Sequence, residues 1–214
     1  MSEKTAAELQ RIYEGRFAST KAYRNRVWQV VVKDFLQPRI GAEQTVLDLG
    51  CGYGEFINNV NCAKKFAMDL NPDAAQYLQA DVTLIQQDCS DPWDLPNESL
   101  DVVFTSNFFE HLPTKDALAE TLRHAMRALR PGGRLIAMGP NIRVLDRTYW
   151  DFWDHHIPIS DRSLVEVLRF AGFGIEEVYP QFLPYSLVGA PQYPLWTVRA
   201  YLRFPVLWRI FGRQ

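Results

Sequence analysis

Three glycines between two acidic residues are the part of this chain whose residue types and spacing best suit the binding of a small molecule. The stretch reads VLDLGCGYGEF, and the short apolar run before the glycines predicts a buried strand. Because glycine has no Cβ, the turn after this strand lets backbone N–H groups approach a ligand closely. The flanking carboxylates, Asp48 and Glu55, would repel a pyrophosphate and favour a cation or an ammonium group. The three glycines are Gly50, Gly52 and Gly54.

The octapeptide at positions 48–55, DLGCGYGE, resembles the first motif of the class I S-adenosylmethionine-dependent methyltransferases. In that family the acidic residue that matches Asp48 lies beside the methionine ammonium group, and the glycines pack under the cofactor. A nicotinamide enzyme is disfavoured, because the dinucleotide fingerprint G-x-G-x-x-G needs a glycine where this chain has Glu55. The resemblance therefore implies S-adenosylmethionine as the cofactor and S-adenosylhomocysteine as the product.

Two further acidic residues follow expected strands, as a nucleoside-binding enzyme requires. Asp69 ends the second strand, where a carboxylate can accept hydrogen bonds from both ribose hydroxyls. The resemblance places Asp88, at the end of the third strand, beside the adenine amino group, with the backbone N–H of Cys89 next to the ring. The cofactor-binding residues that the resemblance implies are Asp48, Gly50, Cys51, Gly52, Gly54, Asp69, Leu70, Asp88, Cys89 and Asn107.

Strand and helix patterns alternate along the chain and predict its architecture. The expected strands are 45–49, 65–70, 82–87, 100–106, 135–138 and 175–179. The expected helices are two within 5–36, one at about 114–130, and one that Ser160 caps. This alternation predicts an α/β fold with a doubly wound, mainly parallel, Rossmann-like sheet of six to seven strands and helices on both faces.

One structural domain in three parts is expected from this order of elements. The parts are N-terminal helices covering the cofactor site (1–40), a methyltransferase core (41–183) and an aromatic and basic helical segment (184–214).

Histidines near the expected acceptor pocket are the candidate catalytic residues. A sulfonium is already a strong electrophile, so methyl transfer needs in-line geometry and exclusion of water. A hydroxyl acceptor must also lose a proton, and histidine is the usual proton acceptor near neutral pH. The candidates are His111 after the fourth strand and His155 and His156 after the fifth. His124, within a helix, is expected to face solvent.

A divalent metal at the same place is the less favoured alternative. Glu110, His111 and one of the two adjacent histidines could supply carboxylate and imidazole ligands. Some methyltransferases that act on RNA ends or on quinone precursors carry a metal after strand four. The RNA enzymes have E-x-x-E-H there, whereas this chain has Asn107 at the first glutamate position, so no metal is expected.

The acceptor is predicted from the loop at 140–160, which is rich in aromatic and acidic residues. Aromatic faces with interspersed carboxylates suit a sugar, and they suit a phenol or an amine almost as well. The run FWDHHIPISDRSLVEVLRFAGF resembles bacterial methyltransferases associated with polysaccharide and glycan biosynthesis. We therefore expect methyl transfer to a small-molecule or saccharide or lipid-linked glycan acceptor at oxygen, by in-line displacement. The alternative is a non-catalytic regulatory protein that binds S-adenosylmethionine.

Composition and charge limit the partners. A net charge of −2 and a pI near 6.1 give no electrostatic case for nucleic acid. The N-terminus has no apolar signal segment, and the three cysteines are odd in number without metal-type spacing, which predicts a cytoplasmic protein. The segment 194–214 combines four arginines with five aromatic residues and no acidic residue, which suits contact with the inner face of a membrane, a lid or a dimer contact. A monomer or a homodimer is expected.

Overall fold

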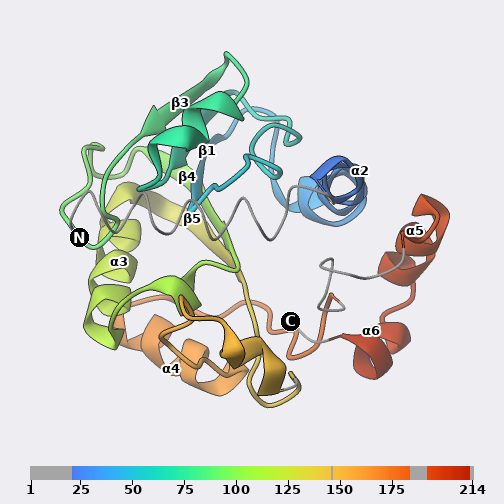
Figure 1. Ribbon diagram of the computed structural model, residues 1–214. Coiled ribbons are helices and arrows are strands. Elements are labelled where there is room, and N and C mark those ends of the chain that lie inside the picture. Colours follow the sequence, from blue (N-terminus) through green and yellow to red (C-terminus); the bar gives the residue numbers. More distant parts are fainter. Residues whose placement is uncertain (1–20, 146, 184–191, 213–214) are drawn as a thin grey trace. The chain divides into compact units, whose positions relative to one another are not determined.

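The computed structural model describes residues 21–145, 147–183 and 192–212 (Figure 1). The expected helix within the first 20 residues lies outside this range. The fold is α/β, and the described strands form a five-stranded sheet in the order β3-β2-β1-β4-β5. The chain divides into two units, Met1–Asp88 with Ser186–Phe204 and Cys89–Tyr185 with Pro205–Gln214.

The first unit contains three parallel strands. They are β1 (Thr45–Leu49), β2 (Lys64–Met68) and β3 (Val82–Ile85). In β1 the side chains from Val46 to Leu49 are all buried, as expected for a strand covered on both faces. The register pairs Leu49 with Met68, so β1 and β2 end side by side. Sequence patterning placed all three strands correctly to within two residues at each end.

The described N-terminal helix of the first unit differs from the second α-helix that was expected within residues 5–36. Regular α2 (Lys21–Val31) continues as a π-helical turn, η1 (Val32–Leu36), and a short 3-10 turn, η2 (Gln37–Arg39). The wider π turn rotates the later side chains around the axis. Leu36 is consequently the fully buried residue, whereas Phe35 is half-buried.

The helix α5 (Leu195–Arg203) packs against α2 and η1 within the same unit. The Tyr23 hydroxyl donates to the main-chain oxygen of Tyr193 at 3.1 Å and accepts its N–H at 3.0 Å. Arg199 lies 3.6 Å from the Asp34 carboxylate. Part of the expected aromatic and basic segment is thus attached to the N-terminal helix. The short η3 (Pro72–Gln76) follows β2.

The second unit contains the parallel pair β4 (Leu100–Ser106) and β5 (Leu129–Met138). β5 begins six residues before the expected start at position 135. Leu129 already pairs with Leu100, and the register then shifts before Val102 pairs with Arg134. The Pro-Gly-Gly turn is therefore a bulge within the strand rather than a break before it.

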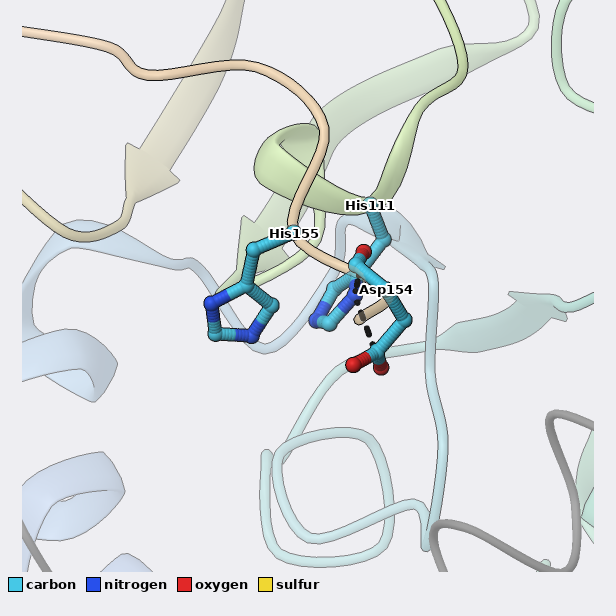
Figure 2. A group of neighbouring side chains, drawn as sticks. All are labelled: His111, Asp154 and His155. Atoms are coloured by element: carbon cyan, nitrogen blue, oxygen red, sulfur yellow. Dashed lines mark hydrogen bonds and ion pairs between the residues drawn. The ribbon is translucent and has the colours of Figure 1, made fainter. Parts of the chain in front are cut away.

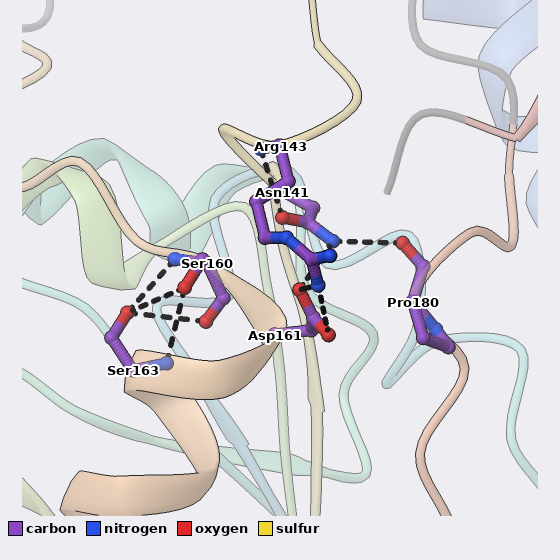
Figure 3. A network of polar contacts seen from close by, with 6 residues as sticks. All are labelled: Asn141, Arg143, Ser160, Asp161, Ser163 and Pro180. Atoms are coloured by element: carbon purple, nitrogen blue, oxygen red, sulfur yellow. Dashed lines mark hydrogen bonds and ion pairs between the residues drawn. The ribbon is translucent and has the colours of Figure 1, made fainter.

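Helices of the second unit follow their capping signals. α3 (Lys115–Ala128) begins after Thr114, whose side chain accepts the Ala117 N–H, and it lies against β5. α4 (Asp161–Phe170) begins after Ser160, as expected. Figure 3 shows the reciprocal hydrogen bonds of Ser160 with Ser163 that close this helix start.

A second anchor holds the first residue of α4. The Asp161 carboxylate accepts hydrogen bonds from Arg143 and from Asn141, and Asn141 also donates to the main-chain oxygen of Pro180 (Figure 3). These contacts connect the segment after β5 to the residues that follow α4.

The strand expected at 175–179 is not formed, so the sheet of the described residues has five strands rather than six or seven. Residues 176–180 are exposed, and the expected strand has no neighbouring strand to pair with in the described part of the chain. The last described helix is α6 (Val206–Phe211), and its Trp208 packs against Phe182 and Tyr179. Among the described helices, none is both long and apolar enough to cross a membrane.

Candidate functional site

The glycine turn after β1 has the backbone conformation that its sequence predicts. Gly52 and Gly54 have φ of +50° and +67°, a region that favours glycine. A Cβ on Gly54 would lie 2.8 Å from side-chain atoms of both Asn58 and Leu78. A Cβ on Gly52 would meet no atom within 4 Å. The turn is therefore packed closely at Gly54 and open at Gly52, where a ligand can approach the backbone.

Asp69 is bonded to the glycine turn. It follows the last residue of β2, and its carboxylate accepts the Gly52 N–H at 2.8 Å and the Asn71 N–H at 2.9 Å. The Gly50 N–H donates to the Met68 main-chain oxygen at 2.8 Å, which ties the turn to the same strand end. The structure thus brings together Asp69 and the glycines, which the sequence predicted to share a cofactor site.

Asp48 is a buried carboxyl at the end of β1, with 3% of its surface exposed. Burial raises its pKa to about 8, although the backbone N–H of Ile57 partly stabilises the charged form. The neighbouring carboxylates of Asp69 and Glu55 raise the pKa further. A carboxyl in this position would gain from a cationic partner, which would favour its ionised form.

The charge assigned to Glu55 needs correction. Arg24 of α2 forms an ion pair with the Glu55 carboxylate, and both side chains are largely buried. The charge of Glu55 is therefore largely neutralised by Arg24 of α2, and the cation preference of the turn rests on Asp48 and Asp69. Asn25 of α2 also accepts a hydrogen bond from Asn59 at 3.0 Å, so the N-terminal helix lies against the segment that follows the glycines.

The remaining predicted cofactor residues are placed individually. Cys51 is buried in the glycine turn, and this burial raises the pKa of its thiol, so its sulfur stays protonated and unreactive. Leu70 and Asp88 are half-buried, after β2 and β3. Cys89 begins the second unit, where its sulfur lies 3.3 Å from the Thr121 hydroxyl oxygen.

Asn107 follows β4 with a left-handed backbone, φ +49°. Its N–H donates to the Met138 main-chain oxygen at 3.0 Å, which holds it at the end of β5 as well. Asparagine tolerates this conformation better than most residues, and such geometry concentrates at functional sites. This observation agrees with the role predicted for Asn107 without testing it.

A cluster of polar side chains in the second unit connects η4 (Phe109–His111) with the loop around η5 (Arg147–Asp151). We call it the histidine cluster; Figure 2 shows three of its members. Nδ1 of His111 lies 2.9 Å from the main-chain oxygen of Asp154 and 3.3 Å from its carboxylate. Nδ1 of His155 lies 2.7 Å from the main-chain oxygen of Tyr149. The cluster consists of Glu110, His111, Tyr149, Asp154 and His155.

Two of the three predicted catalytic histidines, His111 and His155, meet in this cluster, with their ring centres 4.8 Å apart. His156 is exposed, and its main-chain N–H donates to Glu110. Sequence reasoning missed Asp154 and Tyr149 as members, because nothing local connects them to His111. His124 is half-buried with Nε2 3.3 Å from the Ser90 main-chain oxygen, which corrects the expectation that it faces solvent.

Glu110 is buried in the cluster, and burial raises the pKa of its carboxyl. It accepts the Tyr149 hydroxyl hydrogen bond. One potential ligand atom from each of His111, Asp154 and His155 lies within 4.8 Å of the others. The Asp154 carboxylate, however, is next to Nδ1 of His111, the nitrogen already bonded to a main-chain carbonyl. This is the arrangement of a carboxylate that supports an imidazole.

Comparisons with known proteins agree with this architecture. A crystal structure of a SAM dependent methyltransferase from Archaeoglobus fulgidus has a TM-score of 0.66 at 21% identity, covering 92% of this chain and 95% of that chain. An S-adenosylmethionine dependent methyltransferase from Mesorhizobium loti has a TM-score of 0.55 at 20% identity, covering 69% and 82%. At these identities the likeness establishes the fold.

Sequence comparisons add the family. An uncharacterized 37.1 kDa protein in transposon TN4556 of Streptomyces fradiae is 26% identical over 190 residues, which cover 78% of this chain. The chain spans about half the length of this curated relative, 53%. A family model described as a methyltransferase domain matches residues 20–178. Since this match covers most of the sequence, the chain belongs to the methyltransferase-domain family.

Proposed function

We propose that the protein transfers a methyl group from S-adenosylmethionine to an oxygen of a saccharide, a lipid-linked glycan or a small molecule. The observation that carries this proposal is the glycine turn with two carboxyl groups, Asp48 buried and Asp69 bonded to the Gly52 N–H. Asp48 offers a partner for the methionine ammonium group, and Asp69 offers one for the ribose hydroxyls. Membership of the methyltransferase-domain family supports the same reaction.

The proposed chemistry is an in-line displacement at the sulfonium methyl group. The acceptor oxygen forms a bond to the methyl carbon, and the sulfur keeps the electron pair of the bond that breaks. A hydroxyl acceptor must also release its proton, for which His111, His155 and His156 are the candidate acceptors. The histidine cluster supports the first two, because both imidazole rings are held by hydrogen bonds.

A saccharide acceptor is favoured by the aromatic side chains of the loop after β5. Trp150 and Phe152 are half-buried, and Trp153 is exposed. Exposed ring faces can stack against the C–H face of a sugar. Tyr149 is excluded from this role, because it is buried with its hydroxyl on Glu110.

For the C-terminal segment we propose that α5 acts as a cover for α2. The Tyr23–Tyr193 hydrogen bonds and the Arg199–Asp34 ion pair support this role. Peripheral contact with the inner face of a membrane is the second candidate, favoured by the exposure of Trp196 and Phe211. It would suit a lipid-linked acceptor in a cytoplasmic enzyme.

The test is incubation with methyl-labelled S-adenosylmethionine and a panel of saccharides, lipid-linked glycans, phenols and amines. We expect label in a saccharide or glycan at oxygen, together with release of S-adenosylhomocysteine. The Asp69→Ala protein is the control for cofactor-dependent signal. Tight binding of S-adenosylmethionine with no transfer to any class would favour the non-catalytic regulatory protein instead.

A further inference from the structure

The two segments of the histidine cluster are bonded to each other through Glu110. Its main-chain oxygen accepts the N–H groups of His156 at 2.7 Å and Ile157 at 3.1 Å. Its carboxyl accepts the hydroxyl of Tyr149. These bonds run between η4 and the loop at 149–157, so the side chains that project from both segments have fixed relative positions.

The hydrogen bonds of His111 determine which of its ring nitrogens carries the proton. Nδ1 lies within reach of two oxygens of Asp154, the main-chain carbonyl at 2.9 Å and the carboxylate at 3.3 Å (Figure 2). A carbonyl and an ionised carboxylate only accept hydrogen bonds, so Nδ1 is the donor. Nε2 of the neutral ring therefore has the lone pair and can accept a proton.

The partner of Nδ1 distinguishes His111 from His155. Nδ1 of His155 donates to a neutral carbonyl of Tyr149, which fixes the tautomer but adds no negative charge. Nδ1 of His111 faces a carboxylate that is 1% exposed. A buried negative charge behind the ring stabilises the imidazolium that forms when Nε2 takes a proton.

We infer that His111 accepts the proton of the acceptor hydroxyl at Nε2, and that Asp154 is the positioning residue that orients and supports its ring. This inference rests on the proposed methyl transfer to oxygen. As the oxygen forms its bond to the methyl carbon, its O–H electron pair stays on oxygen and the proton moves to Nε2. The proton leaves afterwards to water, which returns the neutral ring.

The charged groups around His111 act in the same direction. Burial lowers the pKa of His111, but the Asp154 hydrogen bond and the charges of Glu110 and Asp154 raise it by more, so the net pKa is raised. The Glu110 charge comes from η4, and the Asp154 charge comes from the facing loop. Tyr149 and His155 of the same loop belong to the cluster, and the His155 ring packs against the His111 ring. His111 thus pairs through Nδ1 with the carboxylate of Asp154.

The first test observes the imidazole directly by NMR, without an acceptor. The His111 signal is assigned by its absence from the His111→Gln protein. We expect the Nδ1–H tautomer in the wild type, with a pKa above the ordinary value of about 6.5. Asp154→Asn should keep this tautomer, because the main-chain carbonyl remains, and should lower the His111 pKa by about one unit or more. Asp116→Asn, which removes an exposed carboxylate of α3, should change neither.

An Nε2–H tautomer in the wild type would overturn the inference, as would an unchanged His111 pKa in the Asp154→Asn protein. Line broadening of His111 and His155 by stoichiometric Mn²⁺, together with transfer activity lost on chelation and restored by Mn²⁺, would assign the cluster to a divalent ion instead.

The second test uses the acceptor that the labelled-cofactor panel identifies. His111→Gln should reduce turnover by about 10²–10⁴-fold with little change in cofactor affinity. Asp154→Asn should reduce it less, by about ten- to a hundredfold, and move the acid limb of the pH–rate profile to lower pH. A loss of turnover without any shift of that limb would make Asp154 merely structural. If no acceptor is methylated, the proposed function fails. The NMR result still shows whether Asp154 supports the His111 imidazole.

Discussion

Asp48 is a buried carboxyl whose charge should change when a cationic ligand binds. Its pKa of about 8 means that it is mostly protonated below this pH in the free protein. An ammonium group beside it would lower that pKa, so binding would release a proton. The affinity for S-adenosylhomocysteine should therefore rise with pH, by up to about tenfold per pH unit, and level off near pH 8.

Calorimetry in buffers of different ionisation enthalpy measures this proton release. Asp48→Asn should bind more weakly and lose the pH dependence between pH 6 and 8. Equal wild-type affinity at pH 6 and pH 8 would show that Asp48 does not face the ammonium group.

Alanine at two neighbouring glycines should separate folding from binding. At Gly54 a Cβ would clash with Asn58 and Leu78, and the backbone is left-handed. Gly54→Ala should lower the free energy of unfolding by about 2–4 kcal/mol, from backbone strain plus overpacking. Gly52→Ala has the strain without the clash, so it should lose about 1–2 kcal/mol. Urea unfolding compares the two variants, and equal losses would contradict the packing described for Gly54.

The main effect of Gly52→Ala should be on ligand binding: the affinity for S-adenosylhomocysteine should fall, although the loss of stability is small. Its Cβ would occupy the open space where a ligand approaches the turn. Unchanged cofactor affinity in this variant would place the ligand elsewhere.

At the scale of single residues, sequence predicted what is local. Asp48, the glycines and Asp69 lie at the ends of two strands, and parallel strands bring their carboxyl ends to one edge. The pairing of His111 with Asp154 spans 43 positions and two irregular segments, so no periodicity signals it. The ion pair that neutralises Glu55 has no local signal for the same reason, since Arg24 is 31 positions away.

At the scale of elements, the strength of the local signal decided each outcome. β1 matches its expected range because a short apolar run is followed at once by the glycines. β5 starts early because pairing with β4 overrides the Pro-Gly-Gly signal. The strand signal at 175–179 is weak because two adjacent glutamates interrupt the apolar residues, and strand formation needs a partner strand as well as a pattern. The π turn after α2 has no sequence signal that separates it from a continuing α-helix.

The start of α4 gives a prediction at this scale. Ser160 accepts the Ser163 N–H at 3.1 Å, and the Ser163 hydroxyl accepts the Ser160 N–H at 2.9 Å. Ser160→Ala should lower the free energy of unfolding by about 1 kcal/mol. Ser160→Asp should keep most of this stability, because aspartate can also cap the helix. Chemical denaturation of both variants provides the check, and no loss in the alanine variant would contradict the capping role.

At the scale of the whole molecule, the C-terminal segment offers a choice between two roles. As a cover, α5 protects apolar surface of α2, so truncation after Gln192 should lower the unfolding midpoint without lipid present. As a membrane contact, its arginines should bring the protein to anionic vesicles, each contributing on the order of 1 kcal/mol.

Vesicle co-sedimentation at low and high salt distinguishes these roles, because salt screens the attraction between the arginines and anionic lipid. We expect a destabilised truncation and little vesicle binding. Strong, salt-sensitive sedimentation that is lost in the truncated protein, together with an unchanged unfolding midpoint of that protein, would contradict the role of α5 as a cover for α2.

The proposed function depends on the binding of S-adenosylmethionine at the glycine turn and Asp69. Its most direct test is a calorimetric titration of S-adenosylhomocysteine into the wild type and the Asp69→Ala protein, with NAD as the competing ligand class. We predict one site in the wild type, a loss of about 1.5–3 kcal/mol in the variant, the scale of hydrogen bonds to a charged group, and no binding of NAD. Tight NAD binding, or equal S-adenosylhomocysteine affinity in both proteins, would contradict the assignment.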